Sequence, residues 1–270
     1  MGESFGFLLF SFPDSDRPAD QSGHFLAILS RNAYNRNGFL EVLGMFTGFT
    51  DETVRFLMDL RFHNYAEYFH ANHDRYVEEV QQPFYRLIED LAPAALKIDP
   101  EIEIRPHKCL SRIHRDTRFS RDKSPYRDHH WFLFRRSAEP REKSLFFFGE
   151  FGPDQLGWGM GIWGENREVL DIFRKKIVAN PDGIQALIHD MDLPERHLGL
   201  GGTFHKRMPV PESVPSGLSR WYLSKEMYIG KVDPERRIAF SDQLRKEMES
   251  DFLAMAPLYR LLRGIYDEKK

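Results

Sequence analysis

The sequence of 270 residues has a single cysteine, Cys109, and therefore no internal disulfide. Because nothing calls for an oxidising compartment, we expect a cytoplasmic protein. Long apolar runs are also missing: none approaches the roughly 18 to 20 residues of a membrane-spanning helix, so we expect no membrane partner. The short run Phe5–Phe12 is apolar but lacks a basic leader and a small-residue cleavage site, which argues against a signal peptide.

A strong charge of one sign is absent as well. The net charge of -3 and the pI near 6.4 argue against a protein that coats nucleic acid through its overall field, although a local basic patch is compatible with them. The glycine-rich run at residues 157–164 lacks the following Lys-Ser/Thr of a phosphate loop and the spacing of a dinucleotide fingerprint. We therefore expect no cofactor. The overall charge argues against nucleic acid as a partner, and the local basic patch keeps that possibility open.

Aromatic residues, in contrast, are abundant. Their share of 14%, with 23 Phe, indicates bulky, sheet-rich packing in a chain whose charged share of 29% is ordinary for a globular protein. The length allows one large domain with a substantial core. We expect residues 46–270 to form a single domain and residues 1–45 to be an N-terminal extension of uncertain order.

Helical patterns lie at both ends of that domain. Thr50 as cap, with Asp51 and Glu52 in the first turn, predicts a helix over residues 51–60. Apolar residues three and four apart predict helices over the following ranges: residues 65–91, with a kink or restart at Pro83 and an end before Pro93; residues 167–178; residues 182–191; and residues 241–266, bent at Pro257.

Short β-rich stretches fill the middle of the domain. Strands are predicted at residues 102–104, 110–114, 129–135, 145–151, 157–164 and 226–232. Short links between them favour antiparallel pairing. We predict an α+β fold, in which an antiparallel sheet from about Glu101 to Trp163 and Glu226 to Val232 is covered by the N-terminal and C-terminal helices. Alternate glycines at residues 157–161 leave one face of their strand bare, either for close backbone packing or for a ligand.

The most distinctive stretch is the basic segment Arg112–Arg127, which holds six basic and two acidic residues. Arginine suits anion binding because its planar fork donates two parallel hydrogen bonds to a carboxylate or phosphate. A second basic cluster follows at residues 205–207. The candidate anion contacts are Arg112, Arg115, Arg118, Lys123, Lys206 and Arg207. His114 and Asp116 are candidate acid or base groups.

Three interpretations of the basic segment stay open. Asp116 and Asp122 can pair with its arginines and make it an ion-paired loop that clamps helices to the sheet. Its cations can instead bind a small anionic, for example phosphorylated, ligand, or dock an acidic protein or RNA. An enzyme requires a concave pocket with several of these cations and a perturbed acid or histidine, whereas an interaction module requires a flat or convex face. Enzymatic activity and oligomeric state are undetermined by the sequence.

Other polar residues are weaker candidates. His129 and His130 are adjacent in a predicted strand and face opposite ways, so they cannot share a metal without a bulge, and we expect no metal site. Cys109 is interpreted as a small buried residue rather than a reactive thiolate. Trp158 and Trp163 are interpreted as core residues.

The order of these motifs resembles the domain of unknown function 2461 family over about Phe46–Tyr266. The motifs are FTGFTDETVRFLMDL, YFHANHDRYVEEVQQPF, LSRIHRDTRFSRDKSPYR, the glycine-rich strand ending at Trp163, HKRMP, and a late Leu-Ser-Lys before a strand. The run R-x-x-R-D-x-R-F-S-x-D-K-S-P-Y is the most specific. The chain has Tyr68-Phe69 where such proteins commonly show a Trp-Phe pair. The resemblance implies no activity, substrate or catalytic residue.

Overall fold

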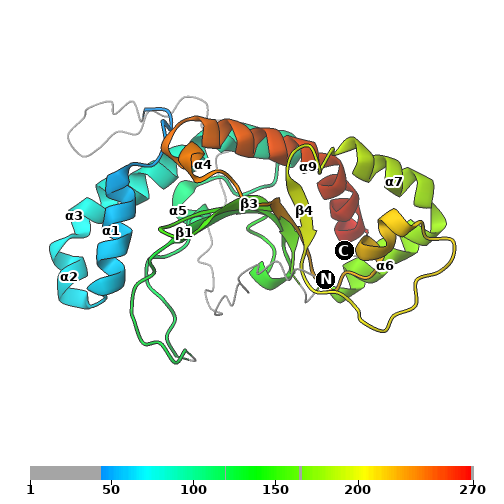
Figure 1. Cartoon of the computed structure of the whole chain (residues 1–270), viewed down its shortest axis with the longest axis horizontal. Coiled ribbons are helices and arrows are strands. Elements are labelled where there is room, and N and C mark those ends of the chain that lie inside the picture. Colours follow the sequence, from blue (N-terminus) through cyan, green and yellow to red (C-terminus); the bar gives the residue numbers. More distant parts are fainter. Residues whose placement is uncertain (1–43, 119, 164–165, 269–270) are drawn as a thin grey trace. The chain divides into compact units, whose positions relative to one another are not determined.

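The computed structural model describes residues 44–118, 120–163 and 166–268 (Figure 1). The predicted N-terminal extension lies almost entirely outside these residues. Phe46–Lys270 form one compact unit. In the described part of the chain, no helix combines the length and the apolar character needed to cross a bilayer.

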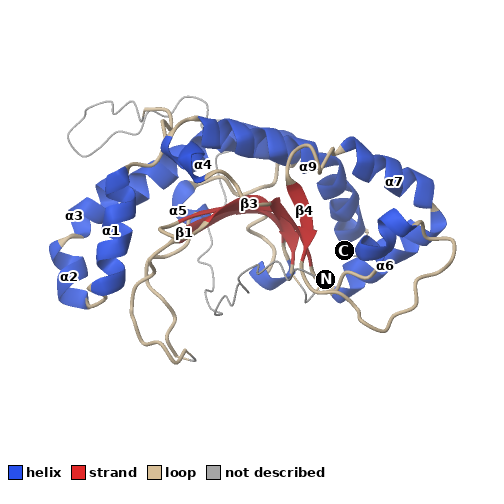
Figure 2. Cartoon of the chain, viewed as in Figure 1, coloured by secondary structure: helices blue, strands red, loops and turns tan. Residues whose placement is uncertain are grey.

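Five strands form one antiparallel sheet in the order β1-β2-β3-β5-β4 (Figure 2). The strands are β1 (His130–Arg135), β2 (Leu145–Phe151), β3 (Leu156–Ile162), β4 (Leu198–Gly201) and β5 (Met227–Lys231). Short links connect β1 to β2 and β2 to β3, so neighbours in sequence pair in antiparallel fashion. Together with the helices this sheet confirms the predicted α+β fold.

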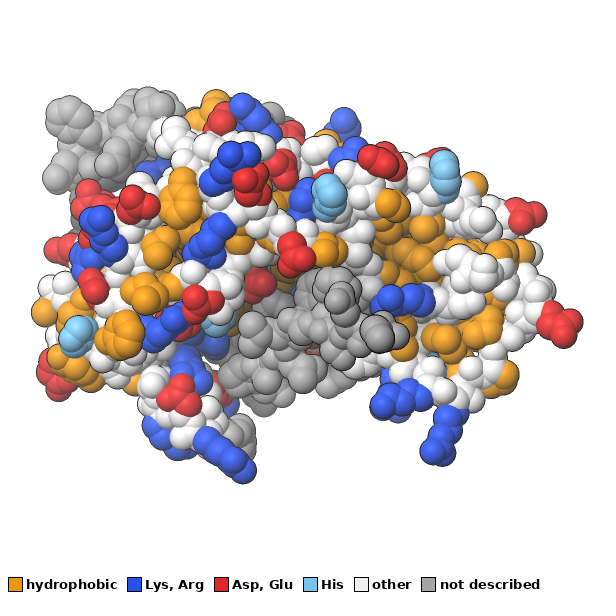
Figure 3. All heavy atoms as spheres, in the orientation of Figure 1, with side chains coloured by type: hydrophobic (Ala, Val, Ile, Leu, Met, Phe, Trp, Pro, Cys, Tyr) orange, Lys and Arg blue, Asp and Glu red, His pale blue; other side chains and the backbone are white. Residues whose placement is uncertain are grey.

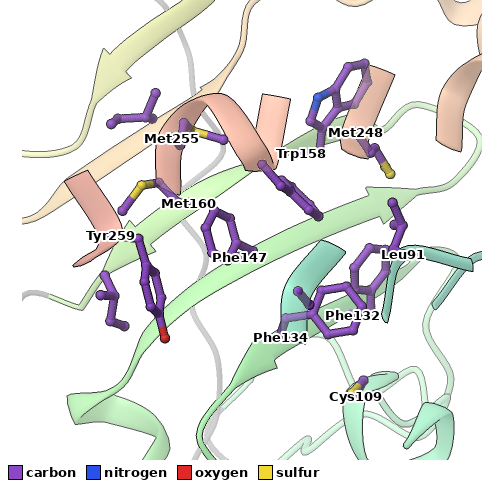
Figure 4. Close-up of a cluster of buried hydrophobic side chains, with 14 of the residues drawn as sticks. Leu91, Cys109, Phe132, Phe134, Phe147, Trp158, Met160, Met248, Met255 and Tyr259 are labelled. Atoms are coloured by element: carbon purple, nitrogen blue, oxygen red, sulfur yellow. The ribbon is translucent and has the colours of Figure 1, made fainter. Parts of the chain in front are cut away.

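Strand alternation gives the sheet two different faces. The core face lies against helices α4 (Gln82–Ile98) and α9 (Gln243–Asp267), as Figure 4 shows for α9. Phe147 of β2 stacks on Tyr259 of α9, with ring centroids 5.1 Å apart. The opposite face is called the second face below. Its side chains come from the intervening strand positions: Trp131, Leu133, Phe146, Phe148, Glu150 and Tyr228.

Two buried carboxylates attach α9 to the rest of the fold. Asp251, 3% exposed, accepts hydrogen bonds from Trp158 Nε1 (2.8 Å) and Lys231 Nζ (3.2 Å) on the core face of the sheet. Asp99, also 3% exposed, accepts from Arg136 Nε (2.8 Å) and Tyr259 Oη (2.7 Å). Burial opposes the ionisation of Asp99, but these hydrogen bonds outweigh it and hold its pKa below the ordinary value. Both carboxylates are therefore paired charges inside the core.

The helix predicted over residues 51–60 is confirmed as α1 (Asp51–Phe62). Thr50 and Thr53 form a capping box, in which each side chain accepts a hydrogen bond from the other residue's backbone N–H. The apolar face of α1 is buried at Phe56, Leu57 and Leu60.

The prediction of one helix over residues 65–91 is wrong in two respects. The segment is interrupted, and its last helix ends later than predicted. The segment is divided into α2 (Ala66–Ala71), α3 (His73–Tyr76), a π-helical segment (Val77–Gln81) and α4. Pro83 does restart the helix, because it lies in the first turn of α4, where a missing N–H costs nothing. Helix α4 then continues through Pro93 to Ile98, since its apolar face packs on α9 and the core and offsets the lost hydrogen bond.

The predicted strands at residues 102–104 and 110–114 are not formed. Pro106 begins a single helical turn, α5 (Pro106–Cys109), and only isolated bridges join Ile102 to Arg136 and Leu110 to Phe132. The strands predicted at residues 129–135, 145–151, 157–164 and 226–232 agree with β1, β2, β3 and β5 to within two residues at each end.

The remaining helices lie beyond the β4 edge of the sheet (Figure 1). They are α6 (Arg167–Ala179), α7 (Pro181–Asp190) and the short α8 (Ser219–Tyr222). Helices α6 and α7 both contact α9. The predicted helices over residues 167–178, 182–191 and 241–266 are therefore confirmed as α6, α7 and α9.

The alternate glycines of β3 serve close packing. A Cβ atom on Gly159 would lie 1.9 Å from the backbone oxygen of Ile229 in β5. On Gly161 it would lie 2.6 Å from the ring of Tyr228 and 2.8 Å from that of Phe146. Of the two uses that the sequence left open, the structure shows close packing at these positions.

Replacing Gly159 by alanine tests this packing. We expect Gly159→Ala to lower the free energy of unfolding by about 2 kcal/mol or more, because the new methyl group must displace backbone atoms of β5. Urea denaturation measures the change. Gly264→Ala is the matched control: nothing lies within 4 Å of its added Cβ in α9, and alanine there should raise stability by about 0.5–1 kcal/mol. Equal stability of Gly159→Ala and the native chain would contradict the packing role.

Candidate functional site

The basic segment Arg112–Arg127 forms a hairpin that extends from the β1 edge of the sheet, drawn as the long green loop below β1 in Figure 1. His114 and Tyr126 form a single β-bridge at its base. Arg115 N donates to Pro125 O (2.8 Å), and Arg127 N donates to Ile113 O (2.9 Å). Residues 113–115 and 125–127 are called the neck below, and residues 116–124 the tip.

The neck is fixed to the turn between α1 and α2. Asn64 Nδ2 donates to Tyr126 O (3.0 Å), and Tyr126 N donates to Asn64 Oδ1 (2.9 Å), so one amide side chain satisfies both backbone groups of a buried residue. The Phe69 ring stacks on Tyr126 with centroids 4.3 Å apart. His114 lies exposed beside Phe69, at 6.0 Å between ring centroids. The hairpin thus joins the helices to the sheet edge.

Both carboxylates of the tip pair with arginines of the hairpin. Arg118 donates to Asp116 through Nε (3.0 Å) and Nη2 (2.6 Å), and these hydrogen bonds lower the pKa of Asp116 to about 2. Arg115 pairs with Asp122, which also accepts from Ser124 N (2.9 Å), and these bonds hold the pKa of Asp122 well below its usual range. Lys123 Nζ donates to the backbone oxygen of Thr117 (2.8 Å). The internal pairing that one sequence interpretation predicted is present.

The six candidate anion contacts do not converge. Lys206 and Arg207 are exposed in the loop between β4 and β5, at one edge of the sheet, whereas the hairpin lies beside β1 at the other edge. Figure 3 likewise shows Lys and Arg side chains in two separate groups along the lower border. The strand order therefore places Arg118 and Lys206 beside opposite edges of the sheet.

One arginine at the base of the hairpin differs from the others. The Arg127 guanidinium carbon lies 4.5 Å from the centre of the Trp131 ring, and Arg127 Nε is buried without a hydrogen-bond partner. Burial, with the nearby guanidinium groups of Arg115 and Arg141, lowers the pKa of Arg127 to about 10, and Asp116 opposes this shift. Among the described residues, no carboxylate forms an ion pair with Arg127.

A histidine with a fixed orientation lies two residues further along the same face. Asp128 accepts hydrogen bonds from Arg61 Nε of α1 (2.6 Å) and from His129 Nδ1 (3.0 Å). The bond from His129, opposed by burial and supported by Arg61, holds the pKa of Asp128 well below its usual range. Because an ionised carboxylate only accepts, His129 donates to Asp128 through Nδ1. The His129 ring lies 5.6 Å from that of Trp131.

A carboxyl group completes this part of the second face. Glu150 lies directly opposite Trp131 in the β1–β2 register, and its Oε1 would be 3.1 Å from a Cβ on Gly157. Burial raises the pKa of Glu150 from 4.5 to about 7, and the charge of His129 opposes the shift. In the described ranges, no side chain or backbone group forms a hydrogen bond with the Glu150 carboxyl group. Sequence reasoning missed Glu150, although a lone carboxylate within the apolar stretch FFFGEF was the available signal.

The weaker candidates His130 and Cys109 both lie in buried surroundings and bond to neighbouring protein groups. His130 faces the core, where Ser111 Oγ lies 3.0 Å from its Nδ1, and burial lowers its pKa to about 3. It therefore points away from His129, as predicted. Cys109 donates to the backbone oxygen of Glu103 (3.1 Å), and burial raises the pKa of its thiol far above the ordinary value. Within the described ranges, no three His, Cys, Asp or Glu side chains group as metal ligands.

Comparison with known families identifies one match. A family model described as "Conserved hypothetical protein (DUF2461)" matches residues 52–261, a range that contains the hairpin, the sheet and most of α9. The match confirms the resemblance inferred from the motifs. No curated protein and no solved structure matches the chain significantly.

Asn64 provides a test of the fixed neck. We expect Asn64→Ala to lower the free energy of unfolding by about 1–3 kcal/mol, because it leaves the buried N–H and C=O of Tyr126 without partners. Amide hydrogen exchange at Tyr126 should also accelerate. Asn64→Asp keeps the acceptor for Tyr126 N, so it should lose less stability than Asn64→Ala. An alanine variant with native stability and native exchange at Tyr126 would show that the neck is held by other contacts.

Glu150 gives the protein a specific pH dependence. Its pKa is higher in the folded chain than in the unfolded chain, so the folded state binds more protons between pH 4.5 and about 7. Stability should therefore fall as the pH rises through this window and then level off, by at most about 3 kcal/mol from this group. The difference in unfolding free energy between the native chain and Glu150→Gln, measured from pH 4 to pH 8, isolates this contribution. A difference that does not change with pH would disprove the raised pKa.

Proposed function

Since the chain belongs to the DUF2461 family of conserved hypothetical proteins, whose description assigns no activity, we propose a function from its own side chains. The protein binds a small anionic ligand, with a phosphate or carboxylate group, at Arg127 on the second face of the sheet. The proposal concerns binding. Catalysis by His114 or Asp116 stays a separate prediction from the sequence.

The observation that carries the proposal is the environment of Arg127. Its side chain is half-buried, its Nε is buried without a hydrogen-bond partner among the described residues, and the described charges that act on it are those of Arg115, Arg141 and Asp116. A buried charge without a counter-ion costs several kcal/mol, so a fold that retains one favours a ligand of opposite charge. A carboxylate or phosphate would accept two parallel hydrogen bonds from the guanidinium.

The surroundings hold this arginine in place. Its backbone N–H is bonded across the neck to Ile113, and the neck is fixed by Asn64 and Phe69. The Trp131 ring supports the flat guanidinium from one side. Because these contacts exist before any ligand arrives, little ordering is required on binding. Arg115 lies close enough to add positive potential, although its own hydrogen bond goes to Asp122.

The alternative function from the sequence is a non-catalytic module that docks an acidic protein or RNA. Its supporting observation is the exposure of Arg112, Arg118 and Arg121 on the hairpin. Such a module would use the exposed arginines rather than Arg127. The two proposals therefore assign binding to different residues.

Sulfate binding by single variants distinguishes them. We expect sulfate to raise the melting temperature of the native chain, and Arg127→Gln to weaken sulfate affinity by about tenfold or more, because a charge-assisted pair is lost. Without sulfate, Arg127→Gln should be as stable as the native chain or more so, since an uncompensated charge is removed. Isothermal titration calorimetry and urea denaturation measure the two effects.

Arg121→Gln is the matched control, because it removes an exposed charge from the same hairpin. It should leave sulfate binding unchanged. Loss of binding in Arg121→Gln but not in Arg127→Gln would favour the docking module. A native chain without affinity for sulfate, combined with a large loss of stability in Arg127→Gln, would reject the anion site in favour of a structural clamp.

A further inference from the structure

Two ionisable side chains on the second face have no counter-ion among the described residues. Arg127 has no carboxylate partner, and Glu150 has no hydrogen-bond donor. Both side chains are half-buried, and Arg127 Nε is fully buried. One requires a negative partner, and the other requires a donor or a positive partner.

These two side chains do not satisfy each other. The described charges that act on Arg127 are those of Arg115, Arg141 and Asp116, and the described charge that acts on Glu150 is that of His129. Trp131 separates them: its ring lies beside the Arg127 guanidinium, and its backbone lies opposite Glu150 in the β1–β2 register. A ligand that satisfied both side chains would therefore need two different groups rather than one.

We propose that the ligand held at Arg127 also carries an amine, which pairs with Glu150 on the other side of Trp131. The ligand class is thus a small zwitterion, with a carboxylate or phosphate at one end and an ammonium group at the other. This inference rests on the proposed anion site at Arg127, and it adds Glu150 as the residue that determines specificity.

Neighbouring carboxylates do not compete for the amine. Asp128 already accepts hydrogen bonds from Arg61 and His129, and Asp116 accepts from Arg118. Glu150 is different because its neighbours on the adjacent strands are Trp131 and Gly157, neither of which carries a charge. Gly157 also leaves room for its carboxyl group, since an added Cβ would lie 3.1 Å from Oε1.

Pairing with an amine requires Glu150 to be ionised. Of the described residues packed around it, His129 is the titratable group that acts on its charge, and Trp131, Phe148 and Gly157 are neutral. Since the carboxyl group loses its proton near pH 7 in the free chain, the affinity for an aminated ligand should increase from pH 6 to pH 8. The affinity for the same acid without the amine should not increase.

Pairs of probes with equal chain length test this inference by isothermal titration calorimetry at pH 8. The pairs are 4-aminobutanoate with butanoate, 6-aminohexanoate with hexanoate, and 8-aminooctanoate with octanoate. We expect the native chain to bind the amino acid of at least one pair about tenfold more tightly than the corresponding alkanoate. The additional affinity comes from the charge-assisted hydrogen bond between the ammonium group and Glu150. Glu150→Gln should abolish this preference and keep the affinity for the alkanoate.

The outcomes separate the two proposals. Equal or tighter binding of the alkanoate in all three pairs, or a preference that persists in Glu150→Gln, would overturn the role of Glu150 while the anion site stands. Alkanoate and sulfate binding that does not change in Arg127→Gln would overturn the anion site itself.

Glu150→Asp provides a second variant in case the glutamine variant does not fold. Its shorter side chain should move the preference to a longer amino acid, and an unchanged optimum would count against the pairing.

Discussion

The two-residue alternation of β1 and β2 is the constraint on which both the fold and the proposed site depend. Phe132 and Phe147 face α9 because they occupy one parity of these strands, and Trp131 and Glu150 face the other way because they occupy the opposite parity. A shift of one residue would exchange the two sets and bring a carboxylate into the helix interface. The buried contact between Trp158 and Asp251 adds a polar requirement to this register, since the indole N–H has its acceptor only on the core face.

The site is defined by which charges lack partners rather than by where charge is dense. In the hairpin, Asp116 and Asp122 pair with Arg118 and Arg115, so two of the arginines in the most basic stretch of the sequence are neutralised within it. Among residues 44–118, 120–163 and 166–268, no carboxylate pairs with Arg127 at the base of the hairpin, and no donor pairs with the Glu150 carboxyl group on β2. A rigid neck and an aromatic ring hold the first of these, and strand pairing holds the second. Binding at the proposed site would therefore require little rearrangement of the backbone.

Prediction from sequence succeeded where local chemistry decides the structure. The cap at Thr50 located the start of α1, and the apolar β-rich stretches located β1, β2 and β3. It was wrong where tertiary contacts override local preference. Helix α4 continues through Pro93 because its buried face compensates the missing hydrogen bond, and Pro106 starts a helical turn where alternation suggested strands. For the site, the basic segment Arg112–Arg127 was predicted, but its hairpin form and Glu150 were not.

The sequence by itself determined the family, the α+β fold class and the place of the basic hairpin, because motifs, strand periodicity and charge are properties of neighbouring residues. Only the tertiary structure decided which charges of the described residues pair with one another. The strand order separates Lys206 from the hairpin, and the register brings Glu150 opposite Trp131. Ion pairing depends on distances between side chains that are far apart in the chain, and burial sets the pKa of each one. Neither quantity is contained in a local pattern of residues.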